Sequence, residues 1–280
     1  MRKFHALLLV AGLLIAAAAA GTRPAPEQLQ LTAGSQVRGD AKGADRCQAP
    51  SHTQMAAWWS GTPFWWWGVY IGGSMMLCAN TNVTASWINT EVNRGWRLLP
   101  IWVGPQAPCT GYADRFPSNT GDAYNKGYNV AHNAYNHASN DLNMDMYKLP
   151  IAYDLEPFDT TNSGCLAAAK AFIRGWDAYL NIAPAQKPGL YGSVGGSGLD
   201  DFWSIDPNPY FIWGARYDGD SHTSDFGGYI GSSHWSNTRH KQYQKNVTRT
   251  YNSVKMTVDL DCAHGPLYGL ADTYVDSACS

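Results

Sequence analysis

The chain has 280 residues, a formal net charge of -2 at pH 7, 45% apolar residues and only 15% charged residues. It is too apolar and too rich in aromatic residues to be a disordered protein. It also lacks the basic excess that nucleic acids and anionic membrane surfaces attract. The length fits one large domain or two small ones, and a single barrel of alternating strands and helices uses about 250 residues.

Residues 1–20 have the pattern of a secretory signal peptide. Two basic residues precede an apolar run from Leu7 to Ala20 that ends in five alanines, as in a signal with a cleavage site after small residues. The run is short for a membrane span of about 20 residues, although a retained N-terminal anchor is an alternative. We therefore expect a flexible leader over residues 21–40 and a secreted or cell-wall-associated domain over residues 41–280, without stable membrane insertion.

Six cysteines lie beyond the predicted signal peptide, and their number agrees with export. An even number in an exported chain indicates disulfides, with buried free thiols as the alternative. The sequence alone allows 15 pairings of six cysteines. None has a C-x-x-C spacing, so a zinc ribbon or redox motif is not indicated. The cysteines are Cys47, Cys78, Cys109, Cys165, Cys262 and Cys279.

Short apolar or aromatic runs alternate with helical patterns in the first two thirds of the chain. Ser51 is a candidate helix cap, and residues 122–140 carry a stripe of small residues that fits close packing on a sheet. Strands are expected to end at Asp45 and to cover residues 66–71, 97–103 and 149–156, and helices are expected after Ser51 and over residues 84–94, 122–140 and 164–181.

The remaining chain contains four further strands but few helices. The strands are expected over residues 188–193, 210–215, 238–244 and 255–261, with a short helix near residues 199–203 and no clear element over residues 218–236. Repeated strand–helix pairs predict a parallel sheet, and eight of them predict an α/β fold of the TIM-like (β/α)₈ barrel type. Helices of the second half are expected to be short or missing. No nucleotide-binding pattern is present, so no cofactor is expected.

An acidic pair ends the fourth predicted strand, where the active site of such a barrel lies. Asp154 and Glu156 are two residues apart and so face the same side, about 6.6 Å apart along the backbone. Two close carboxylates resist ionising together, and one of them becomes a proton donor near neutral pH. Glycoside hydrolysis needs such an acid and a negative group beside the sugar. We predict Glu156 as general acid and Asp154 as its partner; a helix cap or a metal site is the alternative.

Other strand ends supply candidate substrate-binding residues. Asp45 ends the first strand, although it fits a plain turn equally well. Asp259 and Asp261 repeat the two-apart pattern on the eighth strand, where one of them is expected to line the pocket unless they form a salt bridge or turn. Gln242, near the end of the seventh strand, could bind sugar hydroxyls. Tyr70 on the second strand is a further candidate.

Aromatic residues near strand ends fit a sugar-binding mouth because aromatic rings pack against the C–H faces of pyranoses. Trp102, Tyr191 and Trp213 are the candidates, with the barrel core as the alternative place for each. The eight histidines show no metal spacing, so no metal site is expected. A G-x-S-x-G elbow is also missing, which disfavours serine hydrolase chemistry.

Seven short segments, taken together and in order, resemble a family of secreted bacterial glycoside-hydrolase-like domains that is distantly similar to family 25 lysozymes. The resemblance covers the chain from about Gly43 onward and rests on GADRCQAPS (43–51), GVYIGG (68–73), LPIWVGPQ (99–106), YDLE (153–156), LYGS (190–193), HKQY (240–243) and VDLD (258–261). Departures from the family are Gly214, where a bulkier residue is usual, and a long loop over residues 218–235.

The resemblance implies a TIM-like barrel whose pocket is formed by Asp45, Asp154, Glu156, Gln242 and Asp259, with the glutamate as acid. Family 25 enzymes cleave the muramic-acid linkage of peptidoglycan, so peptidoglycan or another polysaccharide is the expected substrate. A non-catalytic glycan-binding barrel remains an alternative, whereas an amidase or peptidase lacks a visible nucleophile or metal triad. We expect a monomer.

Barrel order suggests a disulfide pairing, because cysteines that follow neighbouring strands can approach within the required distance. Cys47 and Cys78 follow the first and second strands. Cys109 and Cys165 follow the third and fourth. Cys262 and Cys279 then remain near the end of the chain, and we predict these three pairs.

Overall fold

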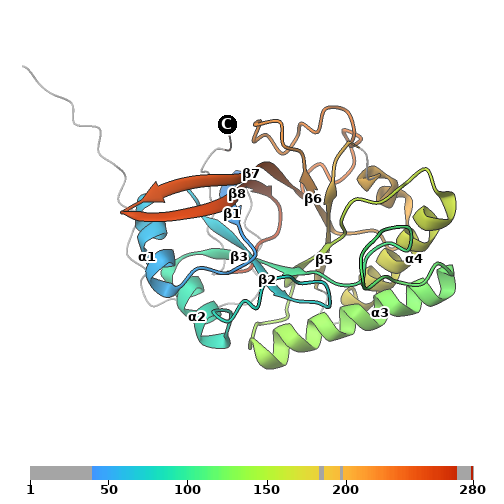
Figure 1. The fold of residues 1–280 in the computed structure, drawn as a ribbon, viewed down its shortest axis with the longest axis horizontal. Coiled ribbons are helices and arrows are strands. Elements are labelled where there is room, and N and C mark those ends of the chain that lie inside the picture. The colour runs from blue at the N-terminus through green and yellow to red at the C-terminus, as the bar shows by residue number, and fades with distance from the viewer. Residues whose placement is uncertain (1–39, 183–185, 196–197, 270–278, 280) are drawn as a thin grey trace, which may run out of the picture.

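Eight strands form a closed barrel in which neighbours follow the order of the chain (Figure 1). The computed structural model describes residues 40–182, 186–195, 198–269 and 279. The predicted TIM-like barrel is thereby confirmed, whereas the predicted signal peptide and the leader up to residue 39 lie outside the described residues. The strands are β1 (Asp40–Asp45), β2 (Trp66–Gly72), β3 (Arg97–Trp102), β4 (Pro150–Asp154), β5 (Lys187–Ser193), β6 (Phe211–Ala215), β7 (Arg239–Tyr251) and β8 (Val254–His264).

The last strand departs from the predicted parallel sheet. Strands β1 to β7 pair in parallel along the chain, whereas β8 is antiparallel to both β7 and β1. β7 and β8 form a long hairpin around Asn252 and Ser253, which have positive φ angles of 46° and 64°. Positive φ at both central residues is typical of the two-residue turns that match strand twist. The prediction of a wholly parallel sheet is therefore wrong at β8, where a tight turn replaces a crossover helix.

Four α-helices and two shorter helical segments follow the earlier strands. Helix α1 begins at the predicted cap, where Ser51 and Gln54 form a reciprocal capping box. After Ser204 the described residues contain no helix, as the prediction of short or missing late helices requires. The segments are α1 (His52–Gly61), α2 (Ala85–Arg94), α3 (Thr120–Asn136), the π-helical turn η1 (His137–Asp141), α4 (Ser163–Leu180) and the 3₁₀ turn η2 (Leu199–Ser204).

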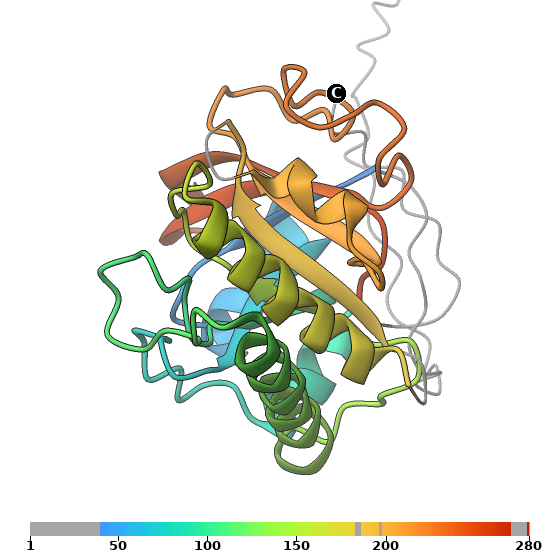
Figure 2. The ribbon, with the colours of Figure 1, turned by 90° about the vertical axis from the view of Figure 1, so that its right-hand side faces the viewer.

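Helices α3 and α4 lie side by side on the barrel (Figure 2). A Cβ atom at Gly127 of α3 would lie 1.9 Å from the carbonyl oxygen of Phe172, and one at Gly175 of α4 would lie 2.0 Å from that of Tyr124. The two backbones therefore touch at these glycines. Gly127, part of the stripe predicted to pack on the sheet, instead contacts the neighbouring helix.

We expect Gly127→Ala to destabilise the fold by about 3 kcal/mol, because the new methyl group would meet backbone that cannot rotate away. The matched control is Gly164→Ala at the start of α4, where the nearest atom is a side-chain oxygen of Asn162 at 3.5 Å. Urea unfolding measures the free energy of unfolding of both variants. Equal stability of the two variants would contradict the close helix contact.

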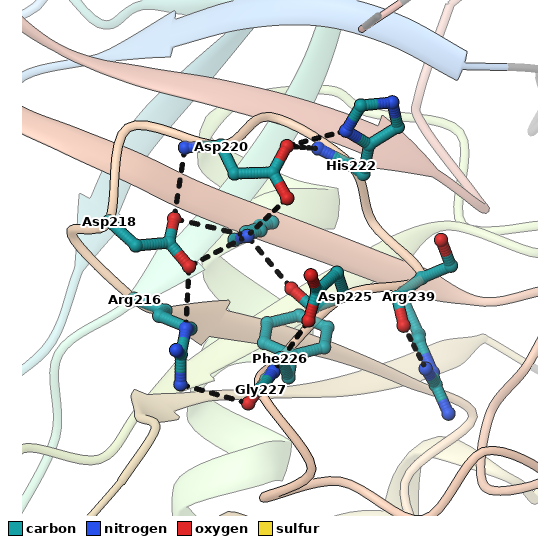
Figure 3. Close-up of polar contacts among 10 residues, drawn as sticks. Arg216, Asp218, Asp220, His222, Asp225, Phe226, Gly227 and Arg239 are labelled. Carbon is teal, nitrogen blue, oxygen red and sulfur yellow. Dashed lines mark hydrogen bonds and ion pairs between the residues drawn. The ribbon is translucent and has the colours of Figure 1, made fainter.

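The long segment between β6 and β7 is an ordered cover on the outer side of these strands (Figure 3). The buried ammonium group of Lys241 on β7 donates to Asp218 Oδ2 at 3.2 Å and to the Asp225 carbonyl at 2.8 Å. The ring of Phe226 fills the space beside Gly214, where a Cβ would lie 2.4 Å from the ring. The small residue at position 214 therefore makes room for this loop, which takes the place of a helix.

Three disulfides join cysteines as the barrel order predicts. Two of them link successive loops, Cys47–Cys78 and Cys109–Cys165, and the third links Cys262 of β8 to Cys279. Every cysteine of the chain is therefore paired, and the first bridge holds together the segments that follow β1 and β2.

Buried side chains form one layer inside the barrel and another between the strands and the helices. Consecutive residues of β2 show both layers, because Trp66 packs inside with Phe211 whereas Trp67 packs outside with Trp58. Much of the aromatic surplus therefore fills the core. No helix among the described residues is long and apolar enough to span a membrane.

Candidate active site

Five side chains predicted for the site meet at one end of the barrel. Asp45 ends β1 and lies opposite Asp259 in the β1–β8 register. Tyr70 donates a hydrogen bond from its hydroxyl to Asp45 Oδ1 at 3.1 Å. Gln242 Nε2 donates to Asp45 Oδ2 at 2.7 Å and to Asp259 Oδ2 at 3.3 Å. Asp154 belongs to the same cluster, because the charge of Asp45 is one of the causes that raise the pKa of Asp154.

The amide of Gln242 has protein partners at all of its polar positions. Besides the two carboxyl groups that accept from its nitrogen, the hydroxyls of Tyr191 and Tyr217 both donate to its Oε1 at 2.9 Å. A glutamine amide offers two donors and two acceptor lone pairs. We therefore assign Gln242 to holding Asp45 and Asp259 in place, rather than to the predicted binding of sugar hydroxyls. Tyr191, a predicted site residue, contacts this group through Gln242, and so does Tyr217, which was not predicted as a site residue.

The acidic pair lies at the end of β4. The strand ends at Asp154, two residues before its predicted end at Glu156. Gln106 Nε2 donates to the Asp154 carbonyl at 2.9 Å, and Gln106 Oε1 accepts from the backbone N–H of Glu156 at 2.8 Å. The buried Gln106 side chain thus replaces a neighbouring strand as the partner of this backbone. Sequence reasoning missed this residue, although a polar side chain four residues after the end of β3 was a visible signal.

Both carboxyl groups of the pair have raised pKa values. Asp154 is 4% exposed, and its Oδ1 has no hydrogen-bond partner among the described residues. Burial, followed by the charges of Glu156 and Asp45, raises the pKa of Asp154 well above its ordinary value. Burial also raises the pKa of the half-buried Glu156. Because the two groups are partly desolvated and the charge of Glu156 acts on Asp154, the pair holds a proton to higher pH than separate, exposed carboxyls would.

Asp45, Asp259 and Asp261 form a second group of carboxyls. Burial and then the charge of Asp259 raise the pKa of Asp45 to about 7, although hydrogen bonds from Gln242, Asp261 and Tyr70 act in the opposite direction. Burial raises the pKa of Asp259 as well. Asp261 is the deepest of the group, since it is fully buried and accepts a hydrogen bond from Trp213 Nε1 at 3.1 Å.

A cavity of about 290 Å³ opens beside the acidic pair. Asp154, Glu156 and Tyr70 line it, so these three predicted site residues share one space. Tyr112 from the loop after β3 closes another side. Burial and then the charges of Glu156 and Asp154 raise the pKa of this phenol, as expected for a hydroxyl near the pair. The other lining residues are Cys47, Met75, Met76, Leu77, Val103 and Gln106.

Two predicted aromatic binders lie elsewhere. Trp102 faces the outer layer, with its ring 6.0 Å from that of His137, because side chains alternate along β3 and Ile101 points inward. Trp213 is buried inside the barrel, with its ring 4.7 Å from that of Tyr191. Neither tryptophan is among the residues that line the cavity.

The raised pKa values predict that the protein loses stability as pH rises. A carboxyl whose pKa is higher in the folded chain stabilises the fold below its unfolded pKa, and this contribution disappears as pH passes the folded pKa. For Asp45, whose pKa moves from 3.8 to about 7, the loss between those values is about 4 kcal/mol at 1.36 kcal/mol per unit. The melting temperature should therefore fall across this range.

Asp45→Asn is the control, because it keeps the shape of the side chain and removes its titration. Calorimetric melting of both proteins between pH 4 and pH 8 should show a shallower fall in the variant. Parallel curves for the two proteins would show that Asp45 titrates normally.

Metal binding finds no support among the residues that the structure describes, which contain no group of three or more His, Cys, Asp or Glu residues placed to hold an ion. The nearest approach to such a group, the Asp45 cluster, is already bound together by Gln242 and Tyr70. Partly desolvated carboxyls with raised pKa values are suited to proton transfer and to stabilising positive charge in a substrate.

Comparison with known families gives a match over most of the barrel. The family model described as Rv2525c-like, glycoside hydrolase-like domain matches residues 56–263. This range includes the acidic pair, Gln242 and Asp259. No protein among those with curated descriptions matches the chain.

Several solved structures are similar to this chain. An uncharacterized protein of B. stearothermophilus is 20% identical, with 83% of this chain and 96% of that chain covered and a TM-score of 0.54. The Tat-secreted protein Rv2525c of Mycobacterium tuberculosis is 13% identical, with 86% and 99% covered and a TM-score of 0.50. The muramidase of Acremonium alcalophilum is 12% identical, with 80% and 92% covered and a TM-score of 0.44. At such identities the first two likenesses establish the fold alone.

Proposed function

Because the chain belongs to the family of Rv2525c-like, glycoside hydrolase-like domains, we propose that it cleaves a glycosidic bond in peptidoglycan or a related cell-wall polysaccharide. Glu156 acts as general acid and Asp154 as its partner carboxylate. The observation that carries the proposal is a single one: the buried Asp154 has an unpartnered oxygen and shares a cavity with Glu156.

The assignment of roles follows from burial. Glu156 is the less buried member of the pair and lines the open cavity, so its carboxyl group can reach the oxygen of the leaving sugar. When the glycosidic bond breaks, the proton of the pair passes to that oxygen through Glu156. Asp154, which is more buried, then offers negative charge to the oxocarbenium-like sugar. A water molecule adds to the anomeric carbon of this sugar and gives a proton back to the pair, which completes the hydrolysis. Gln106 holds the backbone of both residues and so fixes their spacing.

We further propose that the protein is exported. The signal-like start of the chain supports this, as do the three disulfides, which persist in oxidising compartments. The related Rv2525c is described as Tat-secreted, which agrees with a place outside the cell.

Incubation of the purified protein with purified cell wall separates an enzyme from a binding protein. The proposal predicts new reducing ends that accumulate in proportion to time and protein concentration. Saturable binding to the same material, with no reducing ends released, would instead identify a non-catalytic glycan-binding barrel.

A further inference from the structure

One wall of the cavity beside the acidic pair is apolar. Met75, Met76 and Leu77, which follow β2, form this wall together with Val103 after β3. Leu77 is 93% exposed, the highest exposure among the large apolar side chains that the structure describes. An exposed leucine that lines a cavity next to candidate catalytic carboxyls has an apolar surface available to a ligand.

The wall is held in place before any ligand binds. The backbone N–H of Met75 donates to the Val103 carbonyl at 2.9 Å, and the Cys47–Cys78 disulfide ties down the far end of the segment. Gly73 has a positive φ of 116° and approaches Val103 so closely that a Cβ would lie 2.1 Å from its carbonyl oxygen. A fixed wall loses little conformational entropy on binding, which favours affinity.

Sugar hydroxyls would find few partners on this side. The amide of Gln106 is occupied by three backbone groups, and the hydroxyl of Tyr70 donates to Asp45. A hydroxyl buried without a partner costs free energy, whereas a methylene group gains it. The thioethers of Met75 and Met76 adapt readily to an aliphatic chain.

The charged residues that line the cavity further restrict the kind of group that can bind on the wall. The only charged groups among the lining residues are the carboxyls of Asp154 and Glu156, with no lysine or arginine beside them. An anionic substituent would be repelled by these carboxyls and would find no cation, so the group on the wall carries no negative charge.

We propose that the wall formed by Met75, Met76, Leu77 and Val103 binds an alkyl or acyl chain of the substrate, so that the substrate is a glycan that carries an aliphatic substituent next to the bond that is cleaved. This inference rests on the proposed function for the identity of the ligand as a substrate. It adds to that function the residues that determine which substrate binds, most of which lie on the segment after β2.

Binding of methyl, butyl, hexyl and octyl β-D-glucopyranoside, measured by calorimetry below micelle-forming concentrations, tests the wall directly. Each methylene that the wall covers should tighten binding about fourfold, as expected from 0.8 kcal/mol per buried methylene. Leu77→Asn should weaken octyl glucoside binding about tenfold and leave methyl glucoside binding unchanged. Ile182→Asn, at another exposed apolar residue beyond α4, is the matched control and should change neither.

Each outcome of these measurements either supports or overturns the inference. Affinity that does not grow with chain length, or that grows equally in Leu77→Asn, would overturn the inference. A dimer in sedimentation that Leu77→Asn dissociates would also overturn it, and would assign the wall to a second copy of the chain. Reducing-end release from cell wall is measured for the wild-type protein alongside the chain-length effect, so a chain-length effect without any release would support the apolar subsite and reject only the proposed hydrolysis.

Discussion

Replacing Glu156 by glutamine should lower the rate of reducing-end release by about 10²- to 10⁴-fold, the usual contribution of a general acid. The amide has the shape of the carboxyl group but cannot supply its proton. The fold should survive, because the side chain is only half-buried and Gln106 binds the backbone N–H of residue 156 rather than its carboxyl. Initial rates on purified cell wall and thermal melting measure the two properties separately.

The matched control is Asp159→Asn, which neutralises an exposed carboxyl three residues away that binds Thr161 rather than the cavity. It should keep the wild-type rate. If Glu156→Gln releases reducing ends from cell wall as fast as this control, Glu156 is not the general acid.

Replacing Gln242 by leucine should reduce kcat/KM about 100-fold and destabilise the fold by about 3 kcal/mol. The variant removes the donor shared by Asp45 and Asp259 and the acceptor shared by Tyr191 and Tyr217, and buried groups left without partners cost about 1 to 3 kcal/mol each. Because the hydrogen bond from Gln242 lowers the pKa of Asp45, its loss should move that pKa above about 7.

Gln244→Leu provides the comparison, since it makes the same exchange two residues along β7, outside this hydrogen-bond group. Activity, unfolding free energy and the pH dependence of stability are measured for both variants. A Gln242→Leu protein that matches Gln244→Leu in all three would show that the amide does not organise the carboxyls.

Local sequence signals predicted features whose cause is local. Ser51 and Gln54 have the spacing of a capping box, and the helix begins there. The apolar run before Asp154 is ended by acidic residues because the strand reaches solvent at the mouth of the barrel. The disulfides followed from the order of the loops, which a barrel places side by side.

Features that depend on distant contacts were not predictable in the same way. The role of Gln106 rests on backbone groups 48 and 50 residues away. In β2 both faces of the strand are buried, so alternation cannot show which tryptophan points inward. In β3 both faces are buried as well, and for the same reason Trp102 was predicted at the mouth of the barrel. The β7–β8 hairpin did leave a signal, the polar Asn252-Ser253 pair between alternating apolar residues.

Titration of the acidic pair by ¹³C NMR of labelled carboxyl groups tests the central claim most directly, namely that burial and the mutual proximity of the carboxyls raise the pKa values of Asp154 and Glu156. The account predicts that both carboxyls of the wild-type protein titrate above their ordinary range, Asp154 well above it. In Glu156→Gln the pKa of Asp154 should fall, because the neighbouring charge that raises it is gone. Two carboxyls that both ionise near pH 4, and an Asp154 titration unchanged by Glu156→Gln, would contradict the account.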